Sequence, residues 1–90
     1  MPAKEVEALL AAGATVVDVR TPAEFRQRAY PGAINIPLSD LPARLAEIPR
    51  DRPVVLYCAS GARSGAAAGI LRGAGYESAV NAGGLWNMPN

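Results

Sequence analysis

Apolar and polar residues along this chain switch several times between the helix period and the strand period. Residues 3–12 place apolar side chains at helical spacing, and Gly13 follows as a typical stop signal, so a helix is expected over Ala3 to Ala12. The β-branched run from Thr15 to Arg20 predicts a strand that is mostly buried on both faces. The chain therefore begins with a helix followed by a strand.

A short helix and a short strand come next. Thr21 stands at a capping position, Pro22 at the first helical position, and Glu24 at the place that completes a capping box with Thr21. A turn at Tyr30 to Gly32 then leads into a short strand from Ala33 to Ile36.

A third helix is expected to begin with Ser39 as its cap. Leu41, Leu45 and Ile48 would share its buried face. Pro42 is tolerated in this interpretation because it falls in the first turn, where a backbone N–H has no partner to lose.

The second half of the chain repeats the alternation. Val54 to Tyr57 is a continuous apolar strand with Cys58 at its carboxyl end, and Ser64 to Gly75 has the composition of a helix. Ser78 to Asn81 is expected to form a last short strand before a turn at Ala82 to Gly84.

Three glycines and two aromatic residues are assigned to packing. Gly65, Gly69 and Gly73 recur at regular spacing, and a glycine costs about 1 kcal/mol relative to Ala inside a helix. We therefore expect them to allow close packing against the sheet. Trp86 and Tyr57 are expected in the core rather than as platforms for a substrate.

Strands that alternate with helices over short connections favour an open, mainly parallel α/β sheet with helices on both faces, formed by residues 1–90 as one domain. Ligands of such sheets bind beyond the carboxyl ends of the strands. Asp18 to Arg20, the loop after Cys58, and Asn81 to Gly84 should converge there. Asp18 and Arg20 share one face of their strand, so we expect a structural ion pair between them.

The charge balance and the Cys and His counts exclude several kinds of partner and reaction. The 9 basic and 8 acidic side chains give a net charge of +1, so neither a nucleic acid nor a membrane is expected as a partner. One Cys and no His exclude a disulfide framework, a Cys/His zinc site and a Ser-His-Asp triad, and no metal or cofactor is expected. The lack of a signal or a long apolar stretch predicts a cytoplasmic protein.

The segment from Cys58 to Ser64 carries the candidate chemistry. It leaves a strand and enters a helix, and the N-terminal end of a helix lowers the pKa of a nearby thiol from its usual value of about 8.5. Its small residues leave successive N–H groups free to surround an anion, while Arg63 adds a charged two-point donor and Ser64 a cap. The candidate binding residues are Ala59, Ser60, Gly61, Ala62, Arg63 and Ser64.

A lone Cys is more often a buried apolar residue than a nucleophile. An apolar site, however, does not need the anion-binding groups that surround Cys58. The sequence therefore predicts that Cys58 is a reactive thiolate.

The same loop resembles the C-x-x-G-x-R-S active-site loop of single-domain rhodanese-like sulfurtransferases. Three other segments resemble that family in the same order along the chain. Val17 to Phe25 is similar to its D-V-R-x-P-x-E-F segment, Pro31 to Pro37 to its P-G-A-I-N-I-P, and Asn81 to Trp86 to its N-x-G-G. The resemblance implies a five-stranded parallel sheet and a Cys that carries a persulfide.

The resemblance further implies that Cys58 moves sulfane sulfur from thiosulfate or another small anionic persulfide donor to an acceptor. The acceptor would be cyanide, a thiol, or the thiol of a thioredoxin-like or sulfur-carrier protein. A thiolate nucleophile and a sulfite leaving group need no proton transfer, so the lack of His is compatible with this reaction.

Two alternatives remain from the sequence. One is a non-enzymatic sulfur-relay or regulatory docking module with little turnover of small molecules. The other is a phosphatase with a C-x5-R loop, but only four residues separate Cys58 from Arg63, which favours a single sulfur atom over a phosphate.

Overall fold

A computed structural model describes residues 1–90 and shows a four-stranded sheet in the order β2-β1-β3-β4, with every neighbouring pair parallel. The strands are β1 (Thr15–Asp18), β2 (Ile34–Asn35), β3 (Val54–Cys58) and β4 (Ala79–Gly84). The parallel α/β class is confirmed, but the expected fifth strand is absent. The residues before β1 form the helix Ala3–Ala11, and those after β4 form the 3-10 turn Leu85–Asn87.

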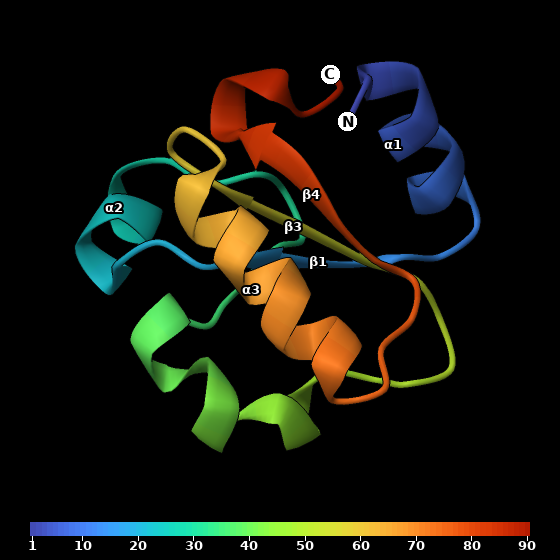
Figure 1. The fold of residues 1–90 in the computed structure, drawn as a ribbon. Coiled ribbons are helices and arrows are strands. Elements are labelled where there is room, and N and C mark those ends of the chain that lie inside the picture. Colours follow the sequence, from blue (N-terminus) through green and yellow to red (C-terminus); the bar gives the residue numbers. More distant parts are fainter.

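Helices cover both faces of the sheet, as predicted (Figure 1). On one face, side chains of β3 such as Leu56 and Cys58 pack with Ala67, Ala68 and Leu71. On the other, alternate residues of β3 join a smaller core with the N-terminal helix and the C-terminal segment. The helices are α1 (Ala3–Ala11), α2 (Pro22–Gln27), α3 (Ala62–Gly73) and the 3-10 segments η1 (Leu38–Ala43), η2 (Leu45–Glu47) and η3 (Leu85–Asn87).

The third helix differs from its prediction. The expected α-helix with Ser39 as its cap is replaced by η1 and η2, and Ser39 makes no capping hydrogen bond. Pro42 lies inside η1 and cannot donate the backbone bond that an α-helix would need, which favours the shorter 3-10 turns. Leu41 and Ile48 are nevertheless buried, so the apolar spacing correctly identified the residues that face the core.

The last strand and the helix before it also have different bounds. The expected turn at Ala82 to Gly84 belongs to β4, with a shift of register opposite Leu56 and Tyr57. The helix begins at Ala62 rather than Ser64, directly after Gly61, whose φ of 102° is favourable only for glycine. The loop after Cys58 is therefore shorter than the sequence indicated.

Two packing expectations are wrong in part. Gly65 packs closely, because a Cβ there would lie 3.2 Å from Asn81 Nδ2, but Gly69 and Gly73 have open space around them. Trp86 is 74% exposed instead of buried, and Arg28 lies over its ring at 4.3 Å. Tyr57 is fully buried as expected, and its hydroxyl accepts a hydrogen bond from the Tyr30 N–H.

The predicted ion pair between Asp18 and Arg20 is confirmed and lies inside the protein. Asp18 is fully buried, and Arg20 is 7% exposed. The Arg20 guanidinium donates to both carboxylate oxygens of Asp18 and also to the Arg28 carbonyl. The pair thus ties β1 to the segment between α2 and β2. No helix of the structure combines the length and the apolar character that crossing a membrane requires.

Candidate active site

The candidate nucleophile is the last residue of a central strand. Cys58 ends β3, and its side chain is buried among residues that face α3. The chain then passes through a tight loop and enters α3 at Ala62, so that the thiol lies at the N-terminal end of that helix. Figure 1 shows this loop, in yellow, beside the red segment that follows β4.

Two groups of the loop and helix contact the sulfur directly. The Gly61 N–H donates to Cys58 Sγ at 3.0 Å, and Ser64 Oγ lies 3.4 Å from the same atom. The positive φ of Gly61 turns its N–H inward, which explains why glycine is suited to that position. Of the predicted binding residues, the structure therefore places Gly61 and Ser64 in contact with the thiol. Ser64, however, contacts the sulfur instead of capping α3, whose N-cap is Gly61.

Asn81 holds the loop from the neighbouring strand. Its Nδ2 donates to the Gly61 carbonyl at 2.9 Å, and its Oδ1 accepts from the Gly83 N–H at 2.9 Å. Ser64 Oγ lies 2.6 Å from that same Oδ1. The single proton of Ser64 can therefore point to Asn81 or turn toward Cys58 when the thiol ionises. The sequence placed Asn81 near the loop but did not reveal this role, whose only signal was its position at the end of the predicted strand Ser78 to Asn81; in the structure it lies within β4.

The environment favours the ionised form of Cys58. Burial by itself raises the pKa of the thiol, but the hydroxyl of Ser64 and the N–H groups of Ser64, Gly61 and Ser60 more than offset burial, and together they lower the pKa to about 7. A large fraction of Cys58 is therefore a thiolate at neutral pH, without any imidazole nearby.

The pH dependence of Cys58 modification tests this environment. Because only the thiolate reacts, the rate of alkylation by iodoacetamide should rise with pH and level off above a midpoint near 7. Ser64→Ala removes a donor to the sulfur and should move the midpoint upward, toward the usual thiol value of about 8.5. Ser39→Ala, at an exposed serine in η1, is the matched control and should leave the midpoint in place. A Ser64→Ala midpoint equal to that of the wild type would contradict the assigned contact.

Gly84 lets the loop and β4 approach each other. A Cβ at Gly84 would overlap with the carbonyl oxygen of Ala59 and lie 3.0 Å from its carbonyl carbon, and backbone atoms cannot move aside cheaply. Gly84→Ala should displace the loop and slow modification of Cys58 about tenfold or more, since small misplacements have large effects on rate. Gly69→Ala, in open space within α3, should leave the rate unchanged. Stopped-flow alkylation of both variants gives the comparison.

Arg63 is not the free anion receptor that the sequence suggested. Its Nη1 and Nη2 donate to Oε1 and Oε2 of Glu24 at 2.8 and 3.1 Å, so its two-point donor already holds a carboxylate. Glu24 also completes the predicted capping box with Thr21. The sequence identified Glu24 only as a helix-capping residue, because nothing local shows that α2 lies against the start of α3.

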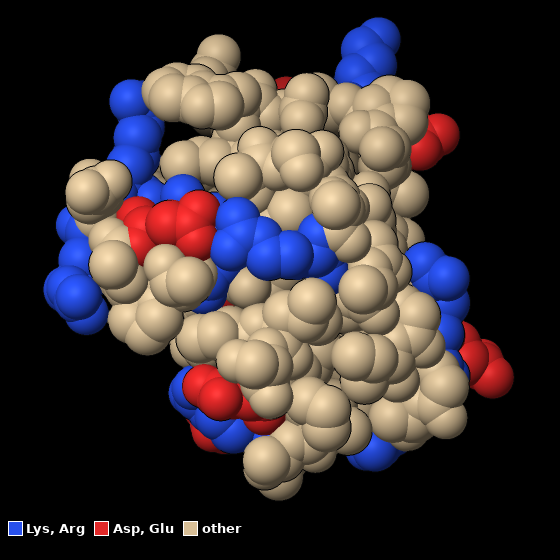
Figure 2. Space-filling view, turned by 60° about the vertical axis from the view of Figure 1, so that its left-hand side comes forward, with Lys and Arg blue, Asp and Glu red and all other residues tan.

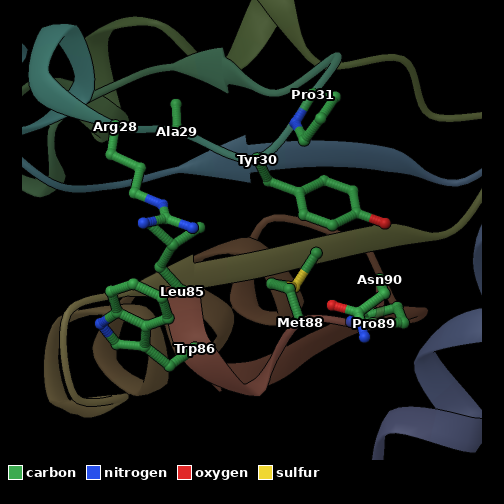
Figure 3. Close-up of a pocket in the computed structure, with 9 residues that line it drawn as sticks. All are labelled: Arg28, Ala29, Tyr30, Pro31, Leu85, Trp86, Met88, Pro89 and Asn90. Carbon is green, nitrogen blue, oxygen red and sulfur yellow. The ribbon is translucent and has the colours of Figure 1, made fainter.

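A pocket of about 370 Å³ lies between the segment after α2 and the segment after β4 (Figure 3). Arg28 and Trp86 stack at one side of it, and Tyr30 and Met88 lie further along. Its first lining residue after β4 is Leu85, next to Gly84, which is the register partner of Cys58. The pocket therefore borders the loop without containing the thiol.

Charged side chains do not separate into areas of one sign on the face shown in Figure 2, where basic and acidic groups lie next to one another. This mixture agrees with the net charge of +1. The structure also brings together no group of three or more His, Cys, Asp or Glu side chains that could hold a metal ion.

Comparison with known proteins identifies the family. The profile of the family described as "Rhodanese-like domain" matches residues 2–87, so this chain belongs to the rhodanese-like family. A "Sulfurtransferase" of Allochromatium vinosum is 48% identical over 66 residues, which are 73% of this chain and 62% of that protein. The "Thiosulfate sulfurtransferase PspE" of Escherichia coli is 44% identical over 71 residues, which are 77% of this chain and 68% of that protein.

Solved structures agree with this assignment. The structure titled "rhodanese with anions from E. coli" has a TM-score of 0.77 at 40% identity, and the match covers 83% of this chain and 93% of that chain. A "Rhodanese-like Domain Protein from Staphylococcus aureus" has a TM-score of 0.84 at 28% identity, with 100% and 90% coverage. The fold is therefore rhodanese-like, and the candidate site lies on the loop that carried the resemblance in the sequence.

Proposed function

We propose that this chain is a sulfurtransferase that carries sulfane sulfur as a persulfide on Cys58. The observation that supports this most strongly is the thiol itself, with a pKa of about 7 and hydrogen-bond donors from one short loop and the start of α3 around it. The names of the two sulfurtransferase relatives support the same reaction class. The chain spans 62% and 68% of those relatives, so the donor and the acceptor belong to this proposal as well.

The loading step needs no acid or base. The Cys58 thiolate attacks the outer sulfur of thiosulfate, a sulfur–sulfur bond forms, and the bond between the two sulfurs of thiosulfate breaks with its electron pair leaving on sulfite. The outer sulfur keeps the negative charge that it carried in thiosulfate, sulfite leaves as a dianion, and the total charge is unchanged. The N–H groups that stabilise the thiolate are the nearest hydrogen-bond donors for the persulfide anion that replaces it.

The unloading step regenerates the thiolate. Cyanide, or the thiolate of a small molecule or protein, attacks the outer sulfur of the persulfide, and the bond to Cys58 breaks with its electron pair returning to Sγ. A thioredoxin-like protein, or a sulfur-carrier protein that presents a thiol, fits this role, because the attacking group must be a sulfur nucleophile. Ala59 and Ser60, at the exposed tip of the loop, are the first residues that such an acceptor would meet.

Intact-mass measurement tests the proposal. The protein is incubated with thiosulfate or cysteine persulfide, and we expect a gain of one sulfur atom that cyanide then removes. Protein blocked with iodoacetamide beforehand should gain none. An unchanged mass with both donors, or an equal gain on the blocked protein, would contradict the proposed function.

A second candidate is a sulfur-relay or regulatory module that exchanges sulfur only with a docked protein. The full burial of Cys58 favours it, since a small molecule must open the site to reach the sulfur. Steady-state production of thiocyanate from cyanide separates the two. A sulfurtransferase turns over many times, whereas a relay module loads once and shows almost no thiocyanate.

A further inference from the structure

The pair between Glu24 and Arg63 lies next to the loop that carries Cys58. Arg63 lies in the first turn of α3 and Glu24 in the first turn of α2, and their side chains meet in a two-point contact at 2.8 and 3.1 Å. The two side chains are 36% and 34% exposed, so the pair is open to solvent on one side. Arg63 is also close enough to Cys58 for the charge of the thiolate to raise the pKa of its guanidinium, after the larger effect of Glu24.

Glu24 is held in place on its other side as well. Its Oε1 accepts hydrogen bonds from the N–H and the hydroxyl of Thr21, each at 3.1 Å. The hydrogen bonds from Arg63 and Thr21 lower the pKa of Glu24 to about 2, so the carboxylate stays ionised at neutral pH. A donor that approaches Cys58 therefore meets a cation that is already neutralised by a fixed anion.

This arrangement has unequal effects on donors of different charge. Thiosulfate carries two negative charges and must approach a thiolate and the Glu24 carboxylate together, while the two-point donor of Arg63 is occupied. An organic persulfide carries at most one negative charge on its reacting sulfurs. The repulsion from Glu24 is therefore smaller for the persulfide than for thiosulfate.

We propose that Glu24, by occupying Arg63, makes this site prefer organic persulfides over dianionic thiosulfate. The inference rests on the proposed function and names its donor class. In the preferred step the Cys58 thiolate attacks the outer sulfur of R–S–SH, the sulfur–sulfur bond of the donor breaks, and R–S⁻ leaves with the electron pair. Cys58–S–SH forms, the proton stays on the outer sulfur, and the total charge is unchanged. Glu24 acts through Arg63 and touches no reacting atom.

Glu24→Gln tests the proposal, because glutamine keeps the length and also completes a capping box at this position, so only the charge is lost. The matched control is Glu47→Gln, which removes the same kind of carboxylate from Arg44 at an exposed pair whose acid lies in η2. Loading of Cys58 is followed by intact mass with thiosulfate and with cysteine persulfide, at low and high ionic strength.

We expect Glu24→Gln to raise the thiosulfate rate relative to the persulfide rate about three- to tenfold at low salt, and less at high salt, because screening weakens the charge effect. The ratio of the two rates cancels any common change in the ionisation of Cys58. A purely structural role of Glu24 would change both rates together and would not depend on salt. An unchanged ratio, or the same change in Glu47→Gln, would overturn the proposal.

A second readout needs no sulfur transfer. Iodoacetate and iodoacetamide alkylate the same thiolate but differ by one negative charge, so Glu24→Gln should raise their rate ratio in favour of iodoacetate. If neither donor loads sulfur while this ratio still rises, the proposed function fails and the charge preference of the site stands. If sulfur loads normally but the alkylation ratio is unchanged, the inference about Glu24 fails and the proposed function stands. If neither reagent reaches Cys58 in either protein, Glu24 does not control entry and the inference fails.

Discussion

Cys58→Ser is expected to lower sulfur loading to background, a decrease of about 10³-fold or more, because the chain has one thiol and no other group that forms a persulfide. A serine hydroxyl has almost the same shape, and the Gly61 N–H that now donates to Sγ can donate to Oγ. The folded structure should therefore survive. Loss of loading together with an unchanged thermal transition would separate a chemical defect from an unfolded protein.

The measurements for this variant are intact mass after incubation with cysteine persulfide and thiocyanate production with cyanide. The wild type gains one sulfur atom and releases it to cyanide, whereas Cys58→Ser should do neither. Thiocyanate production at about a tenth of the wild-type rate would mean that turnover does not pass through Cys58, since removal of a nucleophile lowers the rate far more than tenfold. Alkylation by iodoacetamide gives a second test. The pH-dependent reaction with a midpoint near 7 in the wild type should be absent from Cys58→Ser, because the titrating group is the thiol.

The sheet and the reactive loop could be predicted because their signals are local. β1 and β3 are short runs of β-branched and apolar residues, and such runs are stable as strands only when buried on both faces. The cradle round Cys58 follows from small residues between a strand end and a helix start, and Gly61 has the positive φ that this turn requires. In both cases a few adjacent residues determine the outcome.

The parts that sequence reasoning missed depend on distant contacts or on competing local preferences. Pro42 stands where an α-helix was expected, and the missing donor favours 3-10 turns. Arg63 has the right chemistry for an anion, but its partner Glu24 is 39 positions away in the chain, and only the packing of α2 beside α3 brings them together. Trp86 is exposed because the segment after β4 turns outward beside Arg28.

Asp18→Asn is expected to lower the free energy of unfolding by about 3 to 5 kcal/mol, which is the usual cost of leaving a buried charge without its partner. Both oxygens of Asp18 accept from Arg20, at distances from 2.7 to 3.1 Å, and neither residue is more than 7% exposed. Asparagine replaces one acceptor with an NH₂ group that faces the guanidinium, and it leaves the positive charge uncompensated. The free energy of unfolding of a small domain is about 5 to 15 kcal/mol, so the substitution would remove much of the stability.

Urea unfolding measures the effect, with Glu47→Gln as the control, because it breaks an exposed pair and should leave the transition where it is. If Asp18→Asn lowers the free energy of unfolding by less than about 1 kcal/mol, which is what an exposed ion pair contributes, then Arg20 has found water or another acceptor. The double variant Asp18→Leu with Arg20→Met separates two contributions to the lost stability: the unpaired buried charge, and the contact of Arg20 with the Arg28 carbonyl. If the cost comes mainly from an unpaired buried charge, removing both charges should be less destabilising than Asp18→Asn alone. If the cost comes from losing the tie to the Arg28 carbonyl, the double variant should be at least as unstable, since Arg20 makes that contact.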